Sequence, residues 1–165
     1  MLDPCLSGWT NLSTGCYRLL KASSHQEATT NCNNEGGYLV EINSQDEQDE
    51  LALFYKESKI RRYVWLGGTD ENREGQWIGN YSGKEIMNFN AWRSGYPSGG
   101  LHENCLYSYY SWKLKWEDTP CSYKISGAAA LCEYPDPKEP PVNSSAIPII
   151  GKGYKPGLKW TCGPN

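Results

Sequence analysis

The chain has 165 residues, a net charge of −3 and an isoelectric point of about 5.4, which fits one domain of ordinary size. Its Lys and Arg residues form no run, so the composition argues against a nucleic-acid-binding protein. No apolar stretch approaches the roughly 18 residues of a membrane-spanning helix, so we expect no membrane insertion.

Residues 5–20, which carry turn residues between two apolar ends, predict a short hairpin. A Ser-x-x-Glu capping box and two following glycines predict a helix over 24–35. The sequence "YLVEI" at 38–42 predicts a short strand. A second capping box at Ser44, followed by apolar residues at helical spacing, predicts a second helix.

The second half of the domain is expected to consist of strands and loops. Residues 62–68, "RYVWLGG", predict a buried strand, whereas 84–104 show little regular pattern and predict a long ordered loop. Residues 105–121, "CLYSYYSWKLKWEDTPC", predict two strands with a turn near 110–113. A last strand is predicted within 127–134, "GAAALCEY".

The composition changes at the end of this strand. Residues 135–165 concentrate Pro, Gly and Ser, which is typical of an extended tail or linker. We therefore predict one domain over residues 1–134 and a Pro/Gly-rich C-terminal tail over 135–165.

Seven cysteines lie along the chain: Cys5, Cys16, Cys32, Cys105, Cys121, Cys132 and Cys162. None forms a C-x-x-C pair and His is scarce, which argues against a zinc finger and favours a disulfide framework. Sequons at Asn11, Asn80 and Asn143 agree with a secreted or extracellular glycoprotein. Because seven is odd, one cysteine is left over, and Cys162 in the tail is the candidate for a disulfide-linked dimer.

Several motifs together resemble the long form of the C-type lectin-like domain over residues 5–134. "VWLGGTD" resembles the family's WIGL core strand, and "WEDTPC" stands where the family has WND followed by a cysteine. The pattern W-x-x-G-x-P from Trp92 to Pro97 resembles the lead into the family's long loop, and "ALCEY" resembles its closing strand. The resemblance implies an α+β fold with two helices, two small antiparallel sheets and a long ligand-binding loop.

The resemblance also implies a disulfide map for six of the cysteines. The implied bridges are Cys5–Cys16, Cys32–Cys132 and Cys105–Cys121, with Cys162 unpaired. The second bridge would close a loop of roughly 100 residues and, in the chain-entropy account, stabilise the fold by several kcal/mol.

Sugar-binding members of the family hold a calcium ion beside a cis-proline flanked as Glu-Pro-Asn or Gln-Pro-Asp. Here the triplet at 96–98 is Tyr-Pro-Ser, and a phenol is a poor calcium ligand. The resemblance implies Glu103, Glu117 and Asp118 as calcium ligands, with the Ser98 hydroxyl as a weak fourth. Three converging carboxylates would repel one another, which favours a bound cation. The alternative is that these are ordinary solvated acids.

An auxiliary calcium site occurs in part of the family. Asp70 and Glu74 in "TDENREG" match two of its ligands, whereas Gly99 and Asn104 replace acidic residues. The alternative is that Asp70 and Glu74 are ordinary acids of a turn.

The expected ligand face consists of residues 94–104 and 116–118, where Tyr96, Tyr109 and Trp112 are candidates for exposed aromatic contacts. Four tryptophans are expected in the core: Trp65, Trp77, Trp92 and Trp116.

Three kinds of binding module remain as functional hypotheses. The first is a calcium-dependent lectin that binds glycans on cell-surface glycoproteins, as in innate immunity. The second is a calcium-independent lectin-like domain that binds a protein, and the third is a glycan or lipid-headgroup binder without calcium. An enzyme is not expected, because no G-x-S-x-G, H-E-x-x-H or P-loop motif is present.

Overall fold

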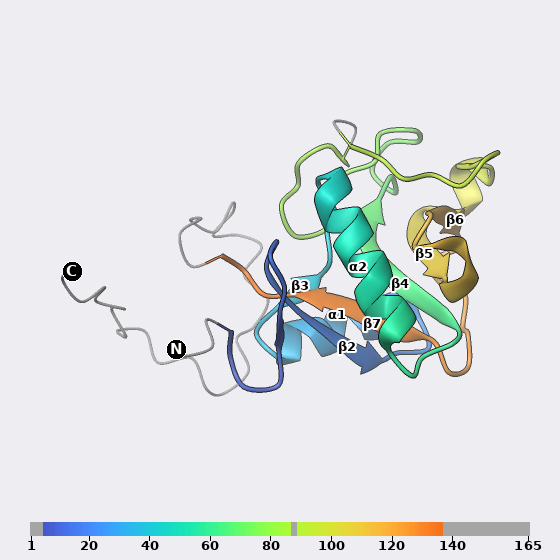
Figure 1. Cartoon of the computed structure of the whole chain (residues 1–165). Helices are drawn as coiled ribbons and strands as arrows, with labels where there is room; N and C mark the ends of the chain where they lie inside the picture. The colour runs from blue at the N-terminus through green and yellow to red at the C-terminus, as the bar shows by residue number, and fades with distance from the viewer. Residues whose placement is uncertain (1–4, 87–88, 137–165) are drawn as a thin grey trace.

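The computed structural model describes residues 5–86 and 89–136, which form two helices packed against one sheet (Figure 1). The predicted tail, with Asn143 and Cys162, lies outside the described residues apart from its first two positions. Within the two described ranges, no helix has the length and apolar character needed to span a bilayer.

Both helices begin where the capping boxes predict. Helix α1, His25–Asn34, begins after Ser24, whose Oγ accepts a hydrogen bond from the Glu27 backbone N–H at 3.2 Å. Helix α2, Gln45–Glu57, begins after Ser44, whose Oγ accepts from the Glu47 N–H at 3.2 Å. Each cap satisfies a backbone donor that the first helical turn leaves unpaired.

The strands form a single sheet of seven, in which β3 pairs with β7 beside the main path β1-β2-β7-β4-β5-β6. The strands are β1 Thr10–Asn11, β2 Cys16–Lys21, β3 Tyr38–Leu39, β4 Tyr63–Thr69, β5 Cys105–Tyr109, β6 Glu117–Thr119 and β7 Ala129–Glu133.

The expected α+β architecture with two helices is confirmed, but the expected pair of small antiparallel sheets is joined into one within the described residues. The junction is a parallel pairing of β4 with β7, at Val64–Ala129 and Trp65–Ala130. The two β7 residues in this pairing are the alanines Ala129 and Ala130, and both are buried between β2 and β4.

Three disulfides are present in the described chain: Cys5–Cys16, Cys32–Cys132 and Cys105–Cys121. They are the pairs that the family resemblance implied. Cys32–Cys132 joins α1 to β7, and Cys105–Cys121 joins β5 to the segment that follows β6. The last bridge therefore fixes the end of the long loop against the segment that follows β6.

The predicted tryptophan core is largely as expected. Trp65, Trp77 and Trp116 are buried, and Trp92 is partly buried with its ring against those of Trp77 and Trp116. An isolated bridge between Trp92 and Trp116 ties the start of the long loop to the segment before β6. The core thus fixes the base on which the expected ligand face stands.

Candidate functional site

The candidate site lies where β6 meets the long loop. Strand β6 carries Glu117 and Asp118, whose residues are each only 3% exposed. The loop approaches them through the peptide bond Tyr96–Pro97, which is cis, as the family resemblance implies.

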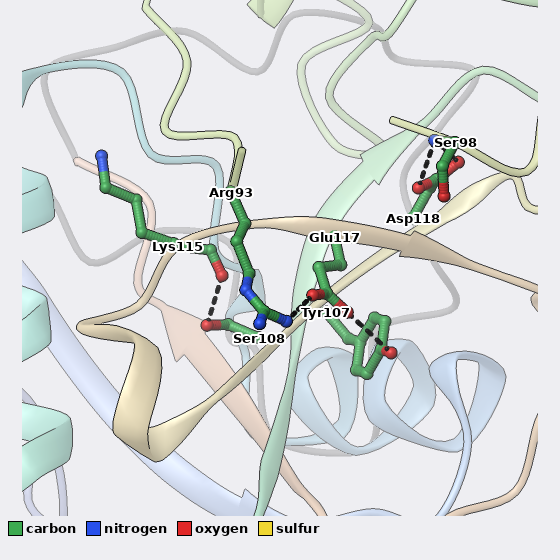
Figure 2. Close-up of polar contacts among 7 residues, drawn as sticks. All are labelled: Arg93, Ser98, Tyr107, Ser108, Lys115, Glu117 and Asp118. Carbon is green, nitrogen blue, oxygen red and sulfur yellow. Dashed lines mark hydrogen bonds and ion pairs between the residues drawn. The ribbon is translucent and has the colours of Figure 1, made fainter. Parts of the chain in front are cut away.

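Asp118 fixes the loop through backbone hydrogen bonds. The Ser98 N–H lies 2.9 Å from both carboxylate oxygens, and the Gly99 N–H donates to Oδ2 at 2.7 Å (Figure 2 shows Ser98 and Asp118). Two backbone amides of the loop therefore bind the Asp118 carboxylate, and charge-assisted hydrogen bonds of this kind are strong.

Glu117 is neutralised by a cation of the chain itself. Its Oε1 forms an ion pair with the Arg93 guanidinium, and its Oε2 accepts a hydrogen bond from the Tyr107 hydroxyl at 3.1 Å (Figure 2). The Tyr96 phenol also bonds to Glu117, and the charge of this carboxylate raises the pKa of Tyr96. Burial, together with the same carboxylate, raises the pKa of Tyr107.

Glu103 is the acidic residue of the site without a donor. Among the described residues, none donates a hydrogen bond to its carboxylate, which packs against Gly99. Partial burial, followed by the charges of Asp118 and Glu117, raises the pKa of Glu103. A Cβ at residue 99 would lie 2.1 Å from Glu103 Oε2, so the glycine is needed for this packing.

A cavity of about 370 Å³ opens at this point. Six of its lining residues carry the chemistry of the site: Tyr96, Ser98, Glu103, Tyr107, Asp118 and Tyr123. The cavity thus combines two acidic groups with three phenol rings.

The aromatic side chains that line the cavity differ from two that the sequence suggested. Tyr109 packs against Tyr63 and Tyr110 and does not line it, and the side chain of Trp112 lies outside the described part of the structure. Tyr107 and Tyr123 line the cavity where Tyr109 does not, and the prediction for Trp112 stays untested. Tyr107 lies directly across from Glu117 in the β5–β6 pair, whereas Tyr109 extends past the end of β6.

The family model of the Lectin C-type domain matches residues 21–134, which is most of the described chain. The chain belongs to the C-type lectin domain family. Domains of this family are non-enzymatic binding modules.

The relatives of this C-type lectin domain include proteins named for sugar binding and one named as calcium-independent. The galactose-specific lectin nattectin of Thalassophryne nattereri is 29% identical over 74% of this chain and 77% of its own. The mouse scavenger receptor C-type lectin carbohydrate-recognition domain superposes with a TM-score of 0.65, at 26% identity over 79% of this chain and 99% of its own. A calcium-independent type II antifreeze protein superposes with a TM-score of 0.64, at 28% identity over 78% and 92%.

The expected auxiliary position of this lectin domain holds two buried oxygens without partners. Asp70 Oδ2 accepts from the Gly75 N–H at 2.9 Å, but Asp70 Oδ1 and Asn104 Oδ1 are buried and accept no hydrogen bond among the described residues. Because Thr69 at the end of β4 pairs with Cys105 at the start of β5, Asp70 and Asn104 lie just beyond the paired ends of the two strands.

Burial, and to a smaller degree the charge of Asp118, raises the pKa of Asp70. Glu74, the other acid expected at this position, is exposed.

The donor set beside Pro97 does not fit a ligand-bridging calcium ion. Calcium takes six to eight oxygens, but the Glu117 carboxylate already faces the Arg93 guanidinium and the Asp118 carboxylate binds the amides of Ser98 and Gly99. Within residues 5–86 and 89–136, no three His, Cys, Asp or Glu side chains are grouped as a metal site.

Proposed function

We propose that this C-type lectin domain is an extracellular recognition module that binds its ligand by direct side-chain contact. The ligand would meet the face formed by 94–104 and 116–118, without a calcium ion shared between protein and ligand at Pro97. The observation that carries this proposal is the ion pair between Arg93 and Glu117.

The guanidinium supplies the positive charge that a calcium ion supplies elsewhere in the family. A divalent cation placed at Glu117 would be repelled by Arg93, and it would have to displace the amides of Ser98 and Gly99 from Asp118. Tyr96 and Ser98 offer weak ligands in exchange. The existence of a calcium-independent relative at 28% identity supports such a domain.

A second candidate, calcium-dependent glycan binding, is favoured by the buried oxygens of Asp70 and Asn104. With Glu103 nearby in the sequence, these residues would hold a calcium ion at the auxiliary position. At the primary position beside Pro97, Glu117 would serve as a ligand only if Arg93 moved. A bound calcium ion would coordinate the two buried oxygens that accept no hydrogen bond among the described residues, Asp70 Oδ1 and Asn104 Oδ1. The galactose-specific relative supports glycans as a ligand class in either case.

Ligand screening tests the proposal. The full chain is applied to a glycan array and to a panel of cell-surface glycoproteins, in 5 mM calcium and again in EDTA. We expect the same hits with equal strength in both buffers, and reduced binding by Glu103→Gln. Hits that vanish in EDTA would overturn the proposal in favour of the second candidate.

The cellular context is also a proposal. We infer a secreted or cell-surface glycoprotein, with the domain at 1–134, a tail at 135–165, glycans on the exposed side chains of Asn11 and Asn80, and a dimer linked by Cys162. Non-reducing electrophoresis of the full chain from a eukaryotic secretion host tests the dimer, and migration at monomer size would contradict it.

A further inference from the structure

We propose that the cavity beside Glu103 binds an organic ammonium group of the ligand. The inference rests on the proposed function, because it concerns the same face of the domain, and it adds the chemical class that this face recognises.

The walls of the cavity suit an organic cation. Tyr96, Tyr107 and Tyr123 all line it, and the Tyr123 residue at its rim is 53% exposed. Aromatic faces attract ammonium groups through the ring quadrupole, most strongly where the cation loses water. A volume of about 370 Å³ lies within the range of small-ligand sites and accommodates a headgroup.

The charges that line the cavity also favour an organic cation. Glu103 and Asp118 line it, and no Lys, Arg or His does so among the described residues. Asp118 is satisfied by amides, so Glu103 is the acid left to meet a ligand. A neutral ligand would remove water from Glu103 without supplying a positive charge, whereas an ammonium group would replace the lost hydration.

An ammonium group also demands less of the site than a metal ion does. It needs one carboxylate and apolar or aromatic walls, and a primary ammonium brings three donors of its own. Glu103 supplies the carboxylate and the partly exposed Tyr123 an aromatic side chain at the cavity, and neither forms part of the contacts of Arg93, Glu117 or the loop amides.

Two sources carry this chemistry, namely a lysine side chain of a protein and an amino sugar of a glycan. The test titrates the ¹⁵N-labelled full chain with Nα-acetyl-lysine amide, glucosamine and tetramethylammonium chloride, each against sodium chloride at equal ionic strength. The Ser98 and Gly99 amides, which bond to Asp118, report events at the cavity. We expect saturable shifts of these signals, and the stronger of the first two probes identifies the source.

Two variants test the contacts of the ammonium group, and a third serves as the control. Glu103→Gln should weaken ammonium binding by about tenfold, the effect of losing one charged partner. Tyr123→Ala should weaken it by a factor of about three, because an exposed cation–π contact contributes less. Glu57→Gln, an exposed acid at the end of α2, should leave the affinity unchanged.

The inference is overturned if no probe gives a saturable shift, or if Glu103→Gln binds as tightly as the parent chain while its thermal melt is unchanged. Its failure differs from that of the proposed function. A saturable shift of the Ser98 and Gly99 signals on addition of calcium would overturn the proposed function. No shift with either calcium or the ammonium probes would overturn only this inference.

Discussion

Two acidic clusters of this domain are compensated in different ways. At the loop, Glu117 and Asp118 meet a guanidinium and backbone amides. In the second cluster, Glu41, Glu47 and Glu133 gather near the start of α2, and none of them forms an ion pair within the described chain. Burial raises the pKa of all three, and that of Glu133 reaches about 8.

The comparison shows how the partner of a carboxylate decides its role. The hydroxyls of Tyr17 and Tyr38 donate to Glu47 and Glu133, but phenols do not replace the charge of a cation. Glu41 and Glu47 are buried and Glu133 is partly buried, so this environment favours the protonated carboxyl groups. In the loop cluster, Glu117 is paired with a guanidinium and Asp118 holds the amides of a loop that borders the cavity, so this cluster shapes the expected ligand face.

The largest expected effect is the pH dependence of the second cluster. Glu133 has a folded pKa of about 8, above its ordinary value of 4.5, so its contribution to stability is complete below pH 4.5 and is lost as the pH rises through 8. We expect the free energy of unfolding to fall by roughly 3–5 kcal/mol over this window from this group.

Urea denaturation at pH 5 and pH 8.5 measures this loss. Glu133→Gln should flatten the profile, because it removes the titrating group and keeps a similar shape. An equal slope in the parent chain and the variant would show that Glu133 is not the group responsible.

The next effect concerns the anchor of the loop. Asp118→Ala leaves the amides of Ser98 and Gly99 without their acceptor, and we expect a loss of about 2 kcal/mol. Faster hydrogen exchange should be confined to these amides and their loop neighbours. Uniformly faster exchange, with the core amides included, would mean that Asp118 supports the whole fold instead.

A smaller effect is expected for the internal cation. Arg93→Gln should cost about 1 kcal/mol, because the Arg93 side chain is 45% exposed and solvent screens part of its interaction. Glu117→Gln in the Arg93→Gln background should recover part of this loss, since it removes the unpaired buried charge. Strictly additive losses in the double-mutant cycle, measured by urea denaturation, would show that the two side chains are not coupled.

Features set by neighbouring residues could be predicted from the sequence. Ser24 and Ser44 cap helices through residues three positions later, so the local pattern was sufficient for both helix starts. The family resemblance supplied the three disulfides, which local patterns leave open. The parallel pairing of β4 with β7 was missed, because it joins strands that are far apart in the chain.

The sequence predicted where the site lies, but not which group each of its carboxylates contacts. The family pattern placed Glu103, Glu117 and Asp118 at the ligand face, but the partner of each carboxylate depends on side-chain direction. Arg93 lies 24 residues before Glu117, and no spacing rule connects them. Tyr107 and Tyr109 alternate onto the same face of β5, and their different partners, Glu117 for Tyr107 and Tyr110 for Tyr109, were not evident from the sequence.

The central claim, that no calcium ion is shared with the ligand at Pro97, is tested most directly by following backbone amides during a calcium titration. The Ser98 and Gly99 amides report the Pro97 position through Asp118, and the Gly75 amide reports the auxiliary position through Asp70. We predict no saturable change at Ser98 and Gly99 up to 10 mM calcium, whatever happens at Gly75. A saturable change at both loop amides that Glu103→Gln abolishes would contradict the claim.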